Sequence, residues 1–190
     1  VDEIRRLIDE LPTKNKVSLI EGRYLPEEFY SSVKGLENEP EGGKRCHVCY
    51  ELRLREAAIT AKELGFDYFT TTLSISPLKD AEKLNEIGKK LSDEYGVSYL
   101  YSDFKKKNGF GRSVELSKKY DLYRQDYCGC EFSMRQRLEE QQARKEAERL
   151  AAIVPGSNVR IKGQTSVGEV MEVNGKNATV AFGSIKTTVK

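Results

Sequence analysis

The chain has 190 residues, of which 38% are hydrophobic and 33% charged, and its formal net charge is +2. This composition is typical of a folded globular protein and excludes a disordered chain. No apolar run reaches the roughly 18 residues that a membrane-spanning helix needs, and the first residues lack the pattern of a secretion signal. We therefore expect a cytoplasmic protein with no membrane partner.

The first 133 residues alternate predicted helices and strands. Helices are predicted over 1–11, 25–36, 45–64, 76–96 and 113–123. Strands are predicted over 16–20, 67–75 and 97–104. In the fourth helix, for example, Leu84, Ile87 and Leu91 recur on one face, and Gly96 closes it. Strands that alternate with helices pair in parallel, so the pattern predicts an α/β domain on a parallel sheet.

The composition changes near residue 152. A charged helix with a thin apolar stripe is expected over 134–152, where it serves as a linker. The last 38 residues hold short alternating apolar segments, and Asn174-Gly175 is a strong hairpin signal. Three further glycines are expected at turns or bulges: Gly163, Gly168 and Gly183. We therefore predict a small SH3-like β-barrel over 153–190, after an α/β domain over 1–133.

Four cysteines fall into two close pairs, Cys46/Cys49 and Cys128/Cys130. The first pair lies at a helix start, where the two side chains share a face and the helix dipole favours thiolate. Gly129 lets the backbone fold tightly between the second pair. Four thiolates suit either tetrahedral zinc or an iron–sulfur cluster, and the spacing does not choose between them. Unrelated reduced thiols are the alternative.

Other polar residues stand where ligands bind in α/β proteins. Four hydroxyl side chains lie toward the carboxyl end of the predicted strand over 67–75 and are candidates for substrate binding: Thr70, Thr71, Thr72 and Ser74. Tyr123 and Arg124 precede the second cysteine pair and are candidates for lining the same pocket. Ordinary β-propensity and tyrosine packing explain these residues equally well.

A basic loop over 105–113 is a candidate for contact with nucleic-acid phosphates. Its cations are Lys105, Lys106, Lys107 and Arg112. Gly109 and Gly111 would let a phosphate approach the backbone closely. The competing interpretation is a solvated charged loop.

Three long stretches carry a family resemblance: "YLPEEFYSSVKGLENEPEGGKRCHVCYELRL", "FDYFTTTLSISPLKDAEKLNEIG" and "SDFKKKNGFGRSVELSKKYDLYRQDYCGC". Through them, residues 1–133 resemble the QueH family of epoxyqueuosine reductases. The resemblance implies a parallel α/β fold related to the adenine-nucleotide α-hydrolases (HUP-type). It also implies reduction of the epoxide of epoxyqueuosine in tRNA to queuosine, with a [4Fe–4S] cluster, an additional iron and an external electron donor.

The resemblance also implies roles for named residues. Cys46, Cys49, Cys128 and Cys130 become metal ligands, with Asp126 in the same shell, and Asp126 and Cys128 become the candidates closest to catalysis. The family's first strand, with an adjacent cysteine pair, has no counterpart here, so we expect an N-terminally truncated domain with four of six cysteines. Two alternatives to an active enzyme are a zinc-stabilised nucleic-acid-binding module and an inactive chimera of two family fragments.

The tail resembles a different family. The stretch "VPGSNVRIKGQTSVGEVMEVNGKNATVAFGSIKTTVK" is similar to the KOW-type barrel of the MutS-related endonuclease-like mismatch-repair homologues. Residues 153–190 carry five Lys and Arg against two Asp and Glu. Arg160, Lys162 and Lys186 are therefore candidates for contact with DNA or the ribosome, and an inert solvated barrel is the alternative.

Overall fold

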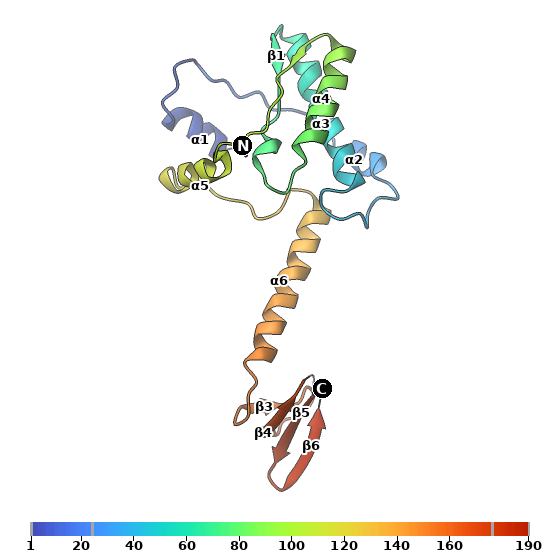
Figure 1. The fold of residues 1–190 in the computed structure, drawn as a ribbon, viewed down its shortest axis with the longest axis vertical. Helices are drawn as coiled ribbons and strands as arrows, with labels where there is room; N and C mark the ends of the chain where they lie inside the picture. The colour runs from blue at the N-terminus through green and yellow to red at the C-terminus, as the bar shows by residue number, and fades with distance from the viewer. Residues whose placement is uncertain (1, 24, 176, 190) are drawn as a thin grey trace. The chain divides into compact units, whose positions relative to one another are not determined.

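The computed structural model describes residues 2–23, 25–175 and 177–189 (Figure 1). It divides into two compact units, Val1–Gln125 and Asp126–Lys190. Across the described residues, none of the helices combines the length and the apolar character that a membrane span requires.

The first unit holds the five predicted helices and two of the three predicted strands. Its elements are α1 (Asp2–Glu10), α2 (Pro26–Ser32), α3 (Lys44–Glu63), β1 (Tyr68–Phe69), the short 3-10 helix η1 (Leu73–Ile75), α4 (Ala81–Tyr95), β2 (Ser98–Tyr99) and α5 (Gly109–Lys119). The two strands pair in parallel, with Tyr68 opposite Ser98 and Phe69 opposite Tyr99. The structure therefore confirms mixed helix and sheet with parallel pairing.

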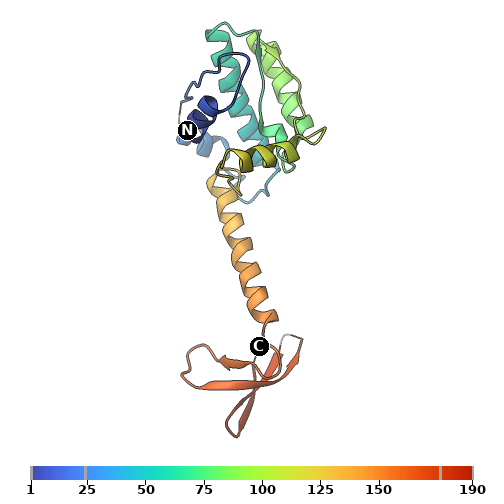
Figure 2. The ribbon, with the colours of Figure 1, turned by 90° about the vertical axis from the view of Figure 1, so that its left-hand side faces the viewer.

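The core of this unit lies where α3 and α4 run side by side next to the two strands (Figure 2). Leu54 and Ala58 of α3 meet Leu84 and Leu91 of α4, and all four are at most 1% exposed. Each inward-facing residue recurs three or four positions after the last, as the sequence pattern predicted. The helix pair is therefore the rigid part on which the loops with candidate functional residues are built.

The predicted strand over 16–20 is wrong. These residues form no strand, and Val17 and Ile20 are 46% and 53% exposed. A β-branched apolar run becomes a strand only when a neighbouring strand supplies hydrogen bonds, and no strand of the described residues pairs with this segment. The strands at 67–75 and 97–104 are also shorter than predicted. Beyond β1, the Thr71 hydroxyl accepts the Leu73 amide (3.2 Å) and starts η1 instead.

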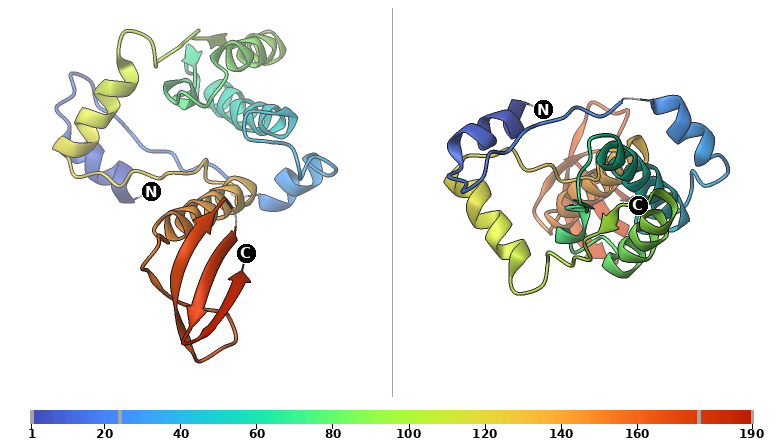
Figure 3. Two further views of the ribbon diagram at one scale, coloured as in Figure 1. Left: turned by 60° about the horizontal axis from the view of Figure 1, so that its bottom comes forward. Right: turned by 90° about the horizontal axis from the view of Figure 1, so that it is seen from above.

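The second unit begins with a helix and ends in an antiparallel sheet. Its elements are α6 (Glu131–Ala151), β3 (Asn158–Arg160), β4 (Val167–Asn174), β5 (Asn177–Phe182) and β6 (Ile185–Val189). The strands lie in the order β3-β4-β5-β6, seen as neighbouring arrows in the left view of Figure 3. Val170 and Val180, at most 1% exposed, form its small core.

Glycines shape this sheet in two ways. Asn174 pairs with Asn177, and Gly175 has φ +60°, so the predicted hairpin is confirmed. Gly168 does not lie at a turn or bulge as expected. It lies within β4 opposite Val159, where a side chain would collide with its neighbours on β5, and the bulge falls between Val170 and Glu172. Here glycine serves close packing.

Candidate metal and substrate site

Cys46 and Cys49 lie in the first turns of α3, as the sequence predicted. Cys46 is 7% exposed, and its Sγ accepts the backbone N–H of Gly42 at 3.3 Å. Cys49 is half-buried, and its Sγ accepts the Nε–H of Arg53 at 3.4 Å. Donors aimed at sulfur stabilise the thiolate that a metal requires.

The loop before Cys46 is held by a buried guanidinium. Arg45, which is 3% exposed, donates from Nη1 to the carbonyl oxygens of Leu36 (3.4 Å), Glu37 (2.9 Å) and Glu39. One side chain therefore ties together three carbonyls of the loop. The sequence gives little sign of this role, because an arginine beside a cysteine could equally face solvent.

The same loop is anchored a second time by an ion pair. The ammonium of Lys79 lies 2.6 Å from the Glu41 carboxylate, and the two side chains are 5% and 21% exposed. Glu41 immediately precedes Gly42, whose amide reaches the Cys46 sulfur. Arg45 and Lys79 together fix the backbone that faces this cysteine.

Cys128 and Cys130 flank a tight turn at the start of α6. Gly129 has φ +93°, a left-handed conformation that favours glycine. Cys130 is the N-cap residue of α6, and its Sγ accepts the backbone N–H of Ser133 at 3.4 Å. The Ser133 hydroxyl accepts the Cys128 amide at 3.0 Å. Sequence reasoning missed Ser133, because a serine at the third helical position is not the Glu or Gln that marks a capping box.

Asp126, the other candidate ligand, is engaged with α6. Its Oδ2 accepts Nε–H of Arg137 at 3.0 Å and Nε2–H of Gln141 at 3.1 Å. Within the described ranges, no three His, Cys, Asp or Glu side chains form a ready metal-binding group. Sulfur ligands nevertheless suit zinc or an iron–sulfur cluster. Three of the four cysteine sulfurs also accept an N–H.

The predicted hydroxyl cluster follows β1, and its hydroxyls bond mainly to the segment that follows β2. Thr70 Oγ1 donates to the Leu100 carbonyl at 2.9 Å. Thr70 and Ser74 each lie 3.4 Å from the Ser102 hydroxyl, and Ser74 is fully buried. These hydroxyls join the two strand ends, whereas Thr72 remains exposed. Burial also raises the pKa of Tyr99, on β2.

The basic loop is a tight, self-packed turn. Lys105 donates to the Lys79 carbonyl at 3.1 Å and lies 3.3 Å from the Asp103 carboxylate. A side chain at Gly109 would collide with the Phe104 carbonyl, and one at Gly111 would collide with Asn108. The two glycines are thus required by packing within the loop, a different reason from the expected approach of a phosphate.

The predicted loop over 105–113 ends earlier than expected, because α5 begins at Gly109. Lys107 is exposed and has φ +52°, and Arg112, in the first turn of α5, is exposed and lies 3.2 Å from the Glu115 carboxylate. Non-glycine residues in this conformation are strained, and such strain concentrates at functional sites. Lys106 is also exposed and lies 3.6 Å from the Asp103 carboxylate. These three cations are available to phosphates.

The segment over 120–125 is tied to α1 and α5. Arg6 of α1 donates to the carbonyl oxygens of Tyr120 (2.9 Å) and Asp121 (3.0 Å), and Figure 3 shows the two helices close together. Arg124 donates to the Ser117 hydroxyl at 2.7 Å. Tyr123 is 72% exposed, so its ring is free to meet a ligand.

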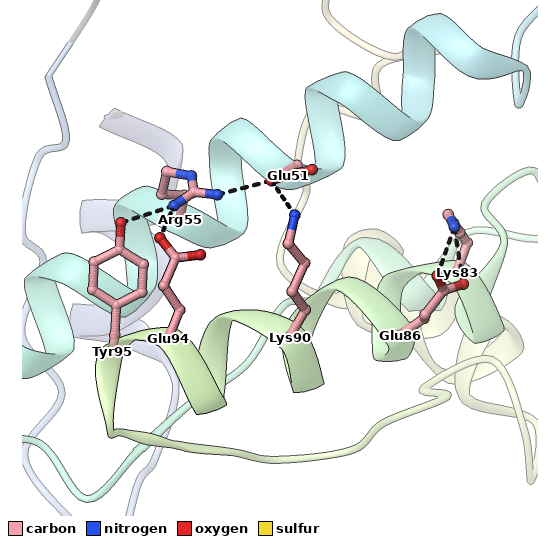
Figure 4. A network of polar contacts seen from close by, with 7 residues as sticks. All are labelled: Glu51, Arg55, Lys83, Glu86, Lys90, Glu94 and Tyr95. Carbon is pink, nitrogen blue, oxygen red and sulfur yellow. Dashed lines mark hydrogen bonds and ion pairs between the residues drawn. The ribbon is translucent and has the colours of Figure 1, made fainter.

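A charged groove of about 250 Å³ lies between α3 and α4, and His47, Glu51 and Lys90 are among the residues that line it. Beside it, Glu51 bridges Arg55 (2.8 Å) and Lys90 (3.0 Å), and Arg55 also pairs with Glu94 (Figure 4). Lys90 and Arg55 lower the pKa of Glu51, and Arg55 lowers the pKa of Glu94. These pairs join the two helices.

Comparison with known families shows which family the cysteine-bearing part of the chain belongs to. A family model described as "Epoxyqueuosine reductase QueH" matches residues 2–136, which include all four cysteines. The chain belongs to the QueH family. A second model, described as "MutS2 and Smr-associated SH3 domain", matches residues 155–190. Both resemblances found in the sequence are therefore confirmed.

Curated QueH relatives match over the first unit and beyond. The epoxyqueuosine reductase QueH of Streptococcus pyogenes is 47% identical over 141 residues, or 74% of this chain and 55% of the relative. That of Staphylococcus epidermidis is 44% identical over 139 residues, or 72% of this chain and 58% of the relative. The chain thus spans little more than half the length of these relatives.

A third relative bears on the tail. The epoxyqueuosine reductase QueH of Helicobacter pylori is 33% identical over 181 residues, which cover 90% of this chain and 48% of the relative. Because this match covers nine-tenths of the chain, it continues past residue 136 and into the range over 155–190. The alignment with this relative therefore extends beyond the residues that the QueH family model matches.

Proposed function

We propose that this chain carries the ligand cysteines and part of the substrate site of an epoxyqueuosine reductase. The observation that carries the proposal is the QueH match over residues 2–136, which contains both cysteine pairs. The N–H donors to the sulfurs of Cys46, Cys49 and Cys130 support it, because hydrogen bonds to ligand atoms orient those atoms for a metal. A HUP-type fold and cytoplasmic tRNA modification belong to the same proposal.

Removal of the epoxide oxygen consumes two electrons and two protons, and leaves a carbon–carbon double bond and water. Protein side chains are poor sources of such electrons, so a [4Fe–4S] cluster and an additional iron supply this redox chemistry when bound, fed by an external donor. In this proposal Cys46, Cys49, Cys128 and Cys130 are ligands, and Asp126 and Cys128 are the residues closest to the reacting oxygen. Arg137 and Gln141 both donate to Oδ2 of Asp126, and the carboxylate has a second oxygen with which it could bind a metal.

Substrate tRNA is proposed to contact the exposed cations of the first unit. Lys106, Lys107 and Arg112 are exposed, whereas Lys105 is half-buried and bonded within its loop. Thr71 and Thr72 have more exposed surface than Ser74, so they are the better candidates for a direct contact with the nucleoside. Tyr123 and Arg124 complete the proposed pocket.

The C-terminal barrel is proposed as a second nucleic-acid contact. Arg160, Lys162 and Lys186 are partly or wholly exposed on it. They form no ion pair among the contacts the described residues show, so their charge is available to an RNA or DNA backbone.

Anaerobic reconstitution with iron and sulfide tests the proposal. Iron, sulfide and zinc are measured together with the visible spectrum, for the chain and for its Cys46→Ser and Cys128→Ser variants. About four irons and four sulfides, lost in both variants, would support the ligand assignment and justify a turnover assay on epoxyqueuosine tRNA. A colourless protein with one zinc would favour the nucleic-acid-binding alternative.

A further inference from the structure

One buried serine bonds both cysteines of the second pair. Ser133 is the third residue of α6 and is 3% exposed. Its hydroxyl accepts the Cys128 amide at 3.0 Å and donates to the Cys130 carbonyl at 3.1 Å. Its own amide donates to the Cys130 sulfur at 3.4 Å. A single residue therefore contacts the backbone before and after Gly129.

A hydroxyl is suited to this position because it donates and accepts at once. Gly129 has the widest backbone freedom of any residue type, so the turn would sample many conformations without a clamp. Ser133 is buried, so replacing it with alanine would remove the acceptor of the Cys128 amide from a position that water does not readily reach. The observed turn therefore depends on Ser133.

We propose that Ser133 is a positioning residue, which holds the Cys128-Gly129-Cys130 turn in the conformation that presents both sulfurs to a metal. This role rests on the proposed function, because the metal at the two cysteines is part of that proposal. Hydrogen-bonded residues behind metal ligands raise affinity by fixing the ligands before the metal arrives. Ser133 would act through the two cysteines without touching substrate.

The test uses Co²⁺ as the probe, because thiolate-to-cobalt absorption reports both affinity and thiolate ligation. The full chain is titrated anaerobically as wild type, Ser133→Ala and Ser133→Thr. Ser157→Ala is the matched control, because the Ser157 hydroxyl also accepts one backbone amide, that of Val154 at 3.0 Å. Circular dichroism checks that α6 persists, and alanine at a helical position should not weaken it.

We expect Ser133→Ala to weaken Co²⁺ binding by about tenfold or more, while Ser133→Thr and Ser157→Ala stay near wild type. Equal affinity in Ser133→Ala and wild type would overturn the positioning role.

Hydrogen exchange of the Cys128 amide in the metal-free protein separates this inference from the proposed function. Protection that is lost in Ser133→Ala and kept in Ser133→Thr would support the role of Ser133 in holding the turn. This conclusion would hold even if wild type showed no thiolate–cobalt band, because a missing band would count only against the proposed metal site. Unchanged protection in Ser133→Ala would contradict the clamp.

Discussion

Lys79 shows how a single side chain supports the first cysteine pair from a distance in sequence. Its ammonium is buried beside Glu41, one residue before the glycine whose amide bonds the Cys46 sulfur. Removal of one partner of a buried pair leaves the other charge uncompensated, whereas removal of both leaves no charge to solvate.

We therefore expect Lys79→Met to lower the free energy of unfolding by about 2–4 kcal/mol. This loss is somewhat smaller than the roughly 3–5 kcal/mol that breaking a fully buried pair costs, because the Glu41 side chain retains some exposure. The Lys79→Met, Glu41→Gln double variant should lose less than Lys79→Met alone. Urea unfolding measures wild type, Lys79→Met, Glu41→Gln and the double variant. Additive losses in the double variant would show that the two side chains do not act as a pair.

At this scale the sequence predicted residue types better than contacts. The cysteine pairs were recognised from spacing alone, because two thiols at a helix start or around a glycine form a local pattern. The roles of Arg45 and Ser133 depend on burial, which arises only once loop and helix are packed. Thr70 and Ser74 were predicted by position, but their bonds to Ser102 needed the fold. Their substrate role stays a prediction.

At the scale of elements, the helices were predictable and the strands less so. Apolar positions spaced for α3 and α4 marked helices correctly, because that periodicity is a property of the segment itself. The segment over 16–20 carried the same kind of local signal for a strand, but a strand also needs a partner to pair with. The parallel pairing of β1 and β2 followed from the helix between them.

The contact between α3 and α4 leads to a pH prediction. Glu51 bridges Arg55 and Lys90, which lower its pKa below the ordinary 4.5. A carboxylate with a lowered pKa in the folded state contributes stability above its unfolded pKa, and that contribution is lost as pH falls through the folded pKa.

Glu51→Gln should therefore cost about 0.3–1 kcal/mol at neutral pH, and the difference from wild type should shrink as pH falls below about 4.5. Urea unfolding at a series of pH values measures the difference. Glu86→Gln is the control, because it removes the same charge from a pair within α4, that of Lys83 and Glu86 (2.9 Å). A difference that stays constant down to acid pH would contradict the assigned bridge.

At the scale of the whole molecule, the chain has two separate hydrophobic cores. The main cluster is drawn from residues 46–99, and the barrel has its own pair, Val170 and Val180. The sequence indicated this division through its change of composition near residue 152. The structure divides the chain at Gln125, because α6 groups with the barrel. Secondary-structure patterns do not reveal which neighbour a linking helix joins.

Two cores predict two independent unfolding transitions, and the chain provides separate probes for them. Nine of the ten tyrosines lie between residues 24 and 123, in the first unit, and the tenth, Tyr127, precedes α6. Tyrosine fluorescence therefore reports mainly on the first unit, whereas the methyl resonances of the valines over 154–189 report on the C-terminal sheet. Val180→Ala should lower the barrel's stability by about 1–3 kcal/mol and leave the fluorescence transition unchanged. Leu54→Ala, at a buried position of α3, should lower the stability of the first unit by about 2–5 kcal/mol and leave the valine methyl transition unchanged. If either variant shifted both transitions equally, the two cores would unfold as one cooperative unit. The C-terminal domain would then stabilise the QueH domain, in addition to its own proposed contact with nucleic acid.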